Sequence, residues 1–319
     1  MSIIGLVDNT TGANHPYNEN NHVFVDGEMI EVVYMTGAEA TAAGWTFSES
    51  SGELTITDVP TLSSPTHVRI PDFVDGLPVR HIGDSGLGEL FRKDGTVTNI
   101  TGITSLTLTT SGNRTFYGCT SLESVSLPSL AATGDYTFYG CTSLVSAYLP
   151  SLTTAGRGAF YGCTSLESVN LPALTTAGSS TFYDCTSLES LHLPSLTAAG
   201  EETFGSCSSL VSVSLPALTT ALNSTFRNCS SLESVFLGAH FNPSSTTNFF
   251  YTDASQDIII YYPPGDEGYG AFWPNGSATE IGDDARIAVP DIQRWNGVIN
   301  DGEVLVRNGN DYESGTPWI

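Results

Sequence analysis

The sequence predicts a mainly β fold, a right-handed solenoid in which short coils of the chain stack on one another. One pattern of residues returns every 22 positions between residues 116 and 237. A period of this length indicates structural units that bury their apolar faces only by stacking on their neighbours. The composition agrees, because 32 glycines and a charged fraction of only 14% are typical of a protein rich in short strands and turns.

Three apolar columns define the repeat, and the members of each column stand 22 residues apart. If the coils stack in register, each column becomes a continuous buried ladder, in which every large side chain contributes about 1.5 to 3 kcal/mol when buried. We therefore expect the six cysteines to form one inner file. The columns are Phe116, Phe138, Phe160, Phe182, Phe204 and Phe226; Cys119, Cys141, Cys163, Cys185, Cys207 and Cys229; and Leu122, Leu144, Leu166, Leu188, Leu210 and Leu232.

Each repeat contains one short strand and a turn that returns the chain. Leu122, Val125 and Leu127 follow the alternating pattern of a strand with one buried face. Translation by one repeat brings equivalent strands side by side at about 4.8 Å, which predicts a parallel sheet on the concave face of a right-handed coil. We expect irregular or short helical turns on the convex face. The strands are expected to end at Pro128, Pro150, Pro172, Pro194 and Pro216, and the Ala-Gly pairs at 155–156, 177–178 and 199–200 to mark the turn.

The repeat resembles the BspA-like leucine-rich repeats of bacteria, whose units share the pattern Ala/Thr-Phe-x-x-Cys-x-Ser-Leu-x-x-Val-x-Leu-Pro. The resemblance is close over residues 116–237. Segments 52–57, 68–71 and 75–83 look like the opening cap of the family, and segment 258–264 with Tyr269 and Trp273 looks like its closing cap. The resemblance implies a leucine-rich-repeat solenoid that acts in recognition or assembly.

Five segments are expected along the chain. Residues 1–44 would form an N-terminal β-hairpin that docks to a larger assembly, and residues 45–101 the N-terminal cap of the solenoid. The repeats would occupy residues 102–237, followed by a C-terminal cap at 238–289 and a C-terminal β-meander at 290–319. The terminal hairpins are predicted around Asp26-Gly27 and Asn308-Gly309. Either terminal segment could instead cover an end of the stack, but a separate cap already follows residues 1–44, which favours docking for them.

The charge balance and the hydropathy pattern exclude several classes of function. Against 34 acidic residues stand 10 basic ones, a net charge of -24 that repels nucleic acid. No run of about 18 apolar residues predicts a membrane span. The first residues lack the basic segment of a signal peptide, so we expect no export signal, whereas secreted members of the resembling family would carry one.

We expect no catalytic residues, no metal site and no cofactor. Equivalent cysteines in stacked coils point the same way, which favours buried free thiols over disulfides, and no Cys-x-x-Cys pair indicates zinc. The six histidines show no spacing typical of metal ligands. The segment 83–86, Gly-Asp-Ser-Gly, is similar to the nucleophile segment of chymotrypsin-like proteases but lies in the predicted cap, without the surrounding fold that this chemistry needs.

A candidate binding stripe follows from the solvent-facing positions of the predicted strands. One column of these positions varies between repeats and is flanked by an invariant serine column at 124, 146, 168, 190, 212 and 234. The variable column would form a row about 20 Å long on the concave face. Aromatic and polar groups on a rigid sheet suit a glycan or a protein loop. The stripe comprises Ser126, Tyr148, Asn170, His192, Ser214 and Phe236.

A second variable column is the pair of residues that follows the Ala-Gly turn of each repeat. Loop positions vary for many reasons, so neutral drift and recognition both stay open for the two columns. The pairs are Asn113-Arg114, Asp135-Tyr136, Arg157-Gly158, Ser179-Ser180, Glu201-Glu202 and Asn223-Ser224.

Together these features predict a recognition or assembly protein and not an enzyme. Our first hypothesis is a bacteriophage virion component, such as a fibre, decoration or receptor-binding protein, since a virion protein leaves the cell by lysis without a signal peptide. It would bind a host surface protein or glycan, contact other virion proteins through residues 1–44, and could form a homo-oligomer. The alternatives are a bacterial cell-surface adhesin of the BspA type and an intracellular interaction scaffold.

Overall fold

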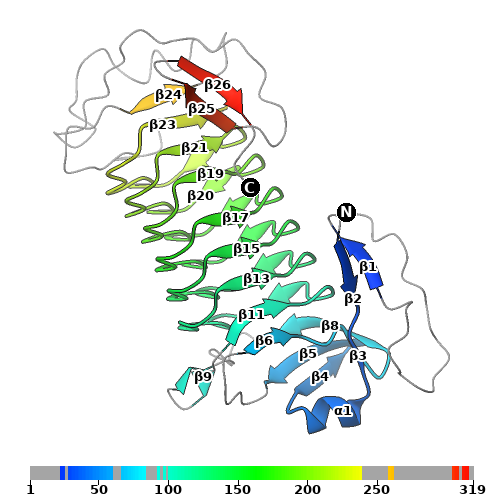
Figure 1. Cartoon of the computed structure of the whole chain (residues 1–319). Helices are drawn as coiled ribbons and strands as arrows, with labels where there is room; N and C mark the ends of the chain where they lie inside the picture. The colour runs from blue at the N-terminus through cyan, green and yellow to red at the C-terminus, as the bar shows by residue number, and fades with distance from the viewer. Residues whose placement is uncertain are drawn as a thin grey trace.

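The computed structural model describes residues 22–25, 28–59, 66–83, 92–93, 96–97, 100–238, 258–261, 304–308 and 311–315 (Figure 1). These residues form a β-solenoid in which coils of the chain stack along one axis, as the 22-residue period predicts. Within the described residues the one α-helix is α1 (Gly37–Ala42), which lies before the coils and is capped by Thr36. The predicted mainly β fold is therefore confirmed.

The first ladder of the solenoid is the one predicted for the concave face, and we call it the concave ladder. Its strands pair in parallel, and each residue pairs with its equivalent in the next coil, as in Ser126 with Tyr148. The strands are β6 (Thr66–Arg69), β11 (Ile100–Thr104), β13 (Ser124–Ser126), β15 (Ser146–Tyr148), β17 (Ser168–Asn170), β19 (Ser190–His192), β21 (Ser212–Leu215), β23 (Ser234–Leu237) and β24 (Ile259–Tyr261).

A second parallel ladder runs along the other side of the coils, and we call it the convex ladder. It extends the sheet of the N-terminal part through β8 (Leu77–Ile82) and β12 (Thr110–Ser111). The turns expected on this face follow its strands. Its strands are only two residues long, too short for an alternating sequence pattern to reveal them. They are β12 (Thr110–Ser111), β14 (Ala132–Thr133), β16 (Thr154–Ala155), β18 (Thr176–Ala177), β20 (Ala198–Ala199) and β22 (Thr220–Ala221).

The N-terminal part closes the first coil with short strands. β4 (Thr46–Ser50) and β5 (Glu53–Asp58) pair antiparallel, and β5 joins β8 (Leu77–Ile82) in parallel. β7 (Phe73–Val74) forms a hairpin with β8 and also pairs with β3 (Tyr34–Met35). The remaining described strands pair antiparallel, namely β1 (His22–Val25) with β2 (Glu28–Glu31), β9 (Arg92–Lys93) with β10 (Thr96–Val97), and β25 (Val304–Asn308) with β26 (Asp311–Gly315).

A buried carboxylate connects this N-terminal part to the repeats. The side chain of Asp72 is fully buried, where an unpaired charge would be costly. It accepts hydrogen bonds from the backbone N–H groups of Val33 and Leu106, at 2.9 and 2.7 Å, and pairs with the guanidinium of Arg69 at 3.0 Å. One residue therefore fixes three segments that lie far apart in the sequence.

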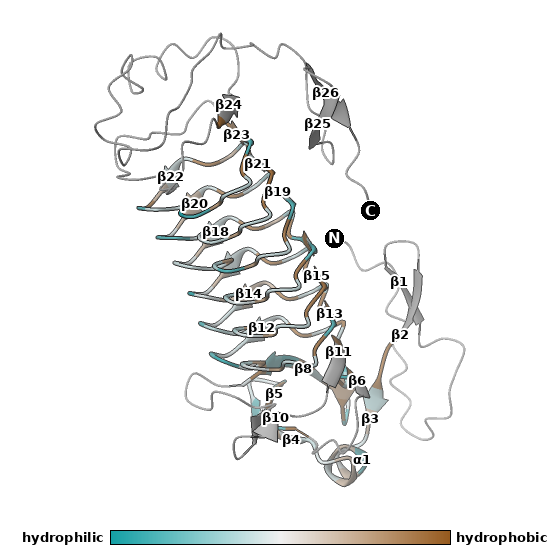
Figure 2. Cartoon of the chain, turned by 60° about the vertical axis from the view of Figure 1, so that its left-hand side comes forward, coloured by the Kyte–Doolittle hydropathy of each residue, from teal (hydrophilic) through white to brown (hydrophobic). Residues whose placement is uncertain are grey.

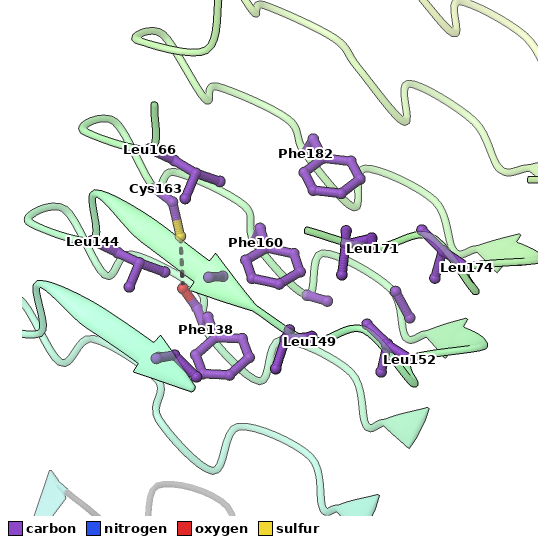
Figure 3. Close-up of a cluster of buried hydrophobic side chains, with 14 of the residues drawn as sticks. Phe138, Leu144, Leu149, Leu152, Phe160, Cys163, Leu166, Leu171, Leu174 and Phe182 are labelled. Carbon is purple, nitrogen blue, oxygen red and sulfur yellow. Dashed lines mark hydrogen bonds between the residues drawn. The ribbon is translucent and has the colours of Figure 1, made fainter. Parts of the chain in front are cut away.

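The core consists of the predicted columns. All members of the phenylalanine, cysteine and leucine columns are fully buried, and the six cysteines are free thiols in one inner file. The phenylalanine rings stack from coil to coil with centroids 5.1 to 5.8 Å apart. Figure 3 shows how the Sγ of Cys163 points at the backbone oxygen of Phe138, to which it donates a hydrogen bond of 3.2 Å. Equivalent bonds of 3.0 to 3.2 Å recur for the other cysteines from Cys141 onward.

The concave ladder is interrupted between β17 and β19, although both coils are fully described. The strands divide into one sheet that ends at β17 and another that begins at β19, whereas the convex ladder continues from β18 to β20. On either side of this interruption, the backbone N–H of the residue after each strand donates to the backbone oxygen of the next strand, as from Leu149 to Asn170 and from Leu193 to Ser214. The N–H of Leu171 makes no such bond to the backbone oxygen of His192. We call this interruption the seam.

Candidate functional site

The concave ladder aligns all six residues of the predicted stripe. Hydrogen-bonded register places Ser126 beside Tyr148 and Tyr148 beside Asn170. Beyond the seam, His192 lies beside Ser214 and Ser214 beside Phe236. The stripe is therefore two rows of three residues, each row held at strand spacing by its own sheet, and not the single row that the sequence predicts.

The side chains of the stripe differ in how far they reach solvent. Asn170 is exposed, whereas Tyr148, His192 and Phe236 are half-buried and Ser214 is buried. The hydroxyls of Tyr148 and Ser214 are shielded from solvent and make no hydrogen bond among the described residues. Such a hydroxyl retains its full capacity to donate and accept, which favours a partner that brings polar groups to it.

The register also identifies stripe residues that sequence reasoning missed. Thr104 of β11 lies beside Ser126, Arg69 of β6 lies beside Thr104, and β24 places Tyr261 in register with Phe236. Thr104 stands 22 residues before Ser126, so extension of the column by one repeat would have found it. Arg69 and Tyr261 fall outside the 22-residue period, so the period gives no signal for them.

The second variable column lies in the turns, and its backbone is constrained. The second residue of each pair has a left-handed conformation, with φ between 52° and 60°. These turns carry hydrophilic residues at the outer edge of the coils (Figure 2). Variation at these positions is therefore limited by conformation as well as by solvent exposure. The six residues are Arg114, Tyr136, Gly158, Ser180, Glu202 and Ser224.

Comparison with known protein families decides the identity of the repeat. The model of the BspA type leucine-rich repeat region matches residues 89–197 and 153–263, which together make up more than half of the chain. The chain belongs to the BspA-type leucine-rich repeat family. No curated protein matches its sequence.

Several solved leucine-rich repeat structures are similar to this BspA-type chain. The T. pallidum leucine-rich repeat protein TpLRR is 26% identical, with a TM-score of 0.44 over 61% of this chain and 83% of that one. A leucine-rich repeat protein from Bacteroides ovatus is 20% identical, with a TM-score of 0.32 over 68% and 74%. A leucine-rich cell surface protein from Faecalibacterium prausnitzii is 18% identical, with a TM-score of 0.33 over 68% and 93%.

The described part of this BspA-type protein holds no cluster of His, Cys, Asp and Glu that could bind a metal ion. It also holds no helix that is long and apolar enough to cross a bilayer. Of the segment 83–86 that is similar to a protease nucleophile, only Gly83 lies within the described residues. Burial raises the pKa of five thiols, to about 12 for Cys207, which makes these thiols poor nucleophiles. The five are Cys141, Cys163, Cys185, Cys207 and Cys229.

Proposed function

We propose that this BspA-type protein is a non-enzymatic recognition protein whose ligand binds along the stripe of Ser126, Tyr148, Asn170, His192, Ser214 and Phe236. The observation that carries the proposal is the hydrogen-bonded register, which holds Ser126, Tyr148 and Asn170 in one row and His192, Ser214 and Phe236 in a second row, each on its own parallel sheet. Residues on a rigid sheet lose little conformational entropy on binding, whereas the ordering of a flexible loop would add a further cost.

The chemistry of the stripe suits a surface glycan or a loop of a surface protein. Half-buried Tyr148 and Phe236 offer aromatic surface, exposed Asn170 offers an amide, and the unpartnered hydroxyls offer further hydrogen bonds. The serine column beside the stripe has small side chains, so a ligand can approach the sheet closely. Recognition of this kind needs no cofactor.

A triple substitution tests the stripe. Tyr148→Ala, His192→Ala and Phe236→Ala together are expected to weaken binding to a glycan array or to host envelope proteins by a factor of about ten or more, since each large contact contributes about 1 kcal/mol or more. The matched control replaces Thr154, Thr176 and Thr220, which are exposed on the convex ladder, with alanine. Unchanged binding by the stripe variant, with an unchanged melting temperature, would remove the proposal.

For the setting we propose a bacteriophage virion component, with the cell-surface adhesin as the alternative. The two settings differ in what residues 1–44 contact, namely other virion proteins in the first and the cell envelope in the second. Mass spectrometry of purified particles and of a surface-shaved cell fraction distinguishes them. Sedimentation of the purified chain tests the predicted homo-oligomer.

A further inference from the structure

A ladder of tyrosines lies on the turn side of the coils, away from the stripe. Their rings stack with centroids 4.7, 4.8 and 4.9 Å apart and planes within 18° of parallel. All four side chains are half-buried, so part of each ring or its hydroxyl faces solvent. With the neighbouring Arg114, Tyr136 and Arg157 we call this surface the tyrosine edge. The ladder consists of Tyr117, Tyr139, Tyr161 and Tyr183.

Two guanidinium groups converge on one ring of this edge. The Cζ of Arg114 lies 5.9 Å from the ring centroid of Tyr136, and the Cζ of Arg157 lies 5.7 Å from the same centroid. Arg114 also lies 5.8 Å from the ring of Tyr117. Cation–π contacts of this kind hold the guanidinium plane in place but leave its N–H donors free for an anion.

Neither arginine has a carboxylate partner among the described residues, although the chain carries 34 acidic residues against 10 basic ones. The third arginine of the repeats, Arg227, pairs with Glu202 at 2.8 Å. Asp135, which stands 22 residues before Arg157, accepts a hydrogen bond from the backbone N–H of Arg157, at 2.9 Å. Both arginine side chains are exposed. Two like charges held beside one ring repel each other, and an anion bound between them would remove that repulsion.

The backbone supports this arrangement. Gly158, the equivalent of Tyr136 in the next coil, lies under its ring, and a Cβ at Gly158 would come within 2.7 Å of that ring. Arg114 and Tyr136 themselves hold left-handed φ values of 56° and 58°. Their side chains are therefore fixed in direction by the turn as well as by their mutual contact.

We propose that the tyrosine edge is a second binding surface, which takes an anionic glycan chain. Arg114 and Arg157 would bind its carboxylate or sulfate groups, and the hydroxyls of the tyrosine ladder would bind the sugar hydroxyls along the next coils. The amphipathic tyrosines, repeated at 4.7 to 4.9 Å, suit a polymer whose polar groups also recur at a regular interval. Toward Tyr183 the edge becomes acidic, with Asp184 and Glu202 near the ladder. The anionic groups are therefore expected at the arginine end.

Size-defined alginate and dextran sulfate test the proposal, with neutral dextran and poly-glutamate as comparisons. At an ionic strength near 0.15 M, screening over about 8 Å weakens repulsion from distant carboxylates but not the direct contact. The variant Arg114→Gln/Arg157→Gln is expected to lose binding by about tenfold or more, since a hydrogen bond to a charged group contributes about 1.5 to 3 kcal/mol. Tyr139→Phe/Tyr161→Phe, which keeps the rings stacked, is expected to weaken binding by a few-fold.

The charge-matched control is Arg80→Gln/Arg227→Gln, which removes two arginines that lie beside carboxylates. It should bind within about twofold of the parent chain, since exposed ion pairs contribute little. Equal loss in both arginine variants would show a general charge effect and overturn the proposal. Absence of binding to both anionic polymers would also overturn it, and stronger binding of poly-glutamate would overturn the assignment to a glycan. The stripe variant is expected to bind these polymers as tightly as the parent chain does. Failure of this proposal can therefore be distinguished from failure of the proposed function of the stripe.

Discussion

At the residue scale, the glycines of the repeat meet two different physical demands. Gly140 lies in a left-handed turn with a φ of 68°, and a Cβ there would meet open space, with its nearest contact at 4.0 Å. Gly156 follows the convex strand, and a Cβ there would come within 2.5 Å of the backbone of Gly134 in the preceding coil. Glycine is favoured at position 140 for its conformation, which Asp184, Ser206 and Asn228 adopt with a side chain in later coils, and at position 156 for the closeness of the stacked coils.

These demands predict different costs for the same substitution. Gly140→Ala is expected to lower the free energy of unfolding by about 1 kcal/mol, the cost of a left-handed alanine less the entropy that it removes from the unfolded chain. Gly156→Ala forces two backbones apart and is expected to cost at least about 2 to 3 kcal/mol. Urea unfolding of both variants measures the difference. Equal losses would contradict the close stacking of the coils.

Residue spacing explains what could be predicted at this scale. The buried columns are visible because stacking selects the same side chain at every coil, so Phe160 and Cys163 recur unchanged around the repeat. The tyrosine ladder has the same 22-residue spacing from Tyr117 to Tyr183 and could have been found in the same way. The left-handed turns could not, because Arg114, Tyr136 and Glu202 give no common sequence signal for one backbone conformation.

At the scale of the strand, the seam coincides with a unique pair of charges. One exposed column at the start of the concave strands reads Glu123, Val145, Glu167, Glu189, Val211 and Glu233, so two glutamates are neighbours only at the seam. The backbone N–H of Glu167 donates to the backbone oxygen of Val145, and that of Glu233 donates to the backbone oxygen of Val211. In these coils, which are described throughout, the N–H of Glu189 makes no such bond to the backbone oxygen of Glu167. Like charges on adjacent strands are destabilising, which explains why the ladder opens there.

Glu189→Val would leave no two glutamates adjacent in this column and is expected to close the seam. The free energy of unfolding should rise by up to about 1 kcal/mol, and hydrogen exchange at the amide of Leu171 should become slower. Glu233→Val is the control, because Val211 and not a glutamate precedes it in the column. Val145→Glu places a glutamate beside both Glu123 and Glu167 and should open the ladder on both sides of residue 145. Unchanged exchange at Leu171 in the Glu189 variant would show that charge does not cause the interruption.

At the scale of the whole molecule, the continuous core and the divided ladder follow from the same repeat. The fold was predictable because every coil must bury the same columns, whereas the division of the stripe between Asn170 and His192 depends on a pair of charges in a neighbouring column. The N-terminal part was only partly predictable, because buried Asp72 unites segments near Val33 and Leu106 that share no period. Periodic contacts are thus visible in the sequence, and unique contacts are not.

The inner file of thiols makes the stability of the whole solenoid depend on pH in the alkaline range. Desolvation by burial raises the pKa of Cys207 from 9.0 to about 12 and also raises the pKa of Cys141, Cys163, Cys185 and Cys229. Below pH 9 a thiol is protonated in both states, so folding is unaffected. Between pH 9 and about 12 the unfolded chain releases protons that the folded chain retains, so stability falls as the pH rises.

Each such thiol is expected to remove about 1.4 kcal/mol of stability per pH unit within this window. Urea unfolding in reducing buffer, at a series of pH values from about 8 to 11, measures how steeply the free energy of unfolding falls with pH. In the variant Cys163→Ala/Cys185→Ala this slope should be smaller by about 2.7 kcal/mol per pH unit. Tyrosine ionisation affects the parent chain and the variant alike, so the difference between their slopes reports the contribution of the two thiols. The lower stability of the variant at every pH does not change this difference. Identical slopes would mean that the thiols ionise equally in the folded and unfolded chains, which is incompatible with a dry inner file.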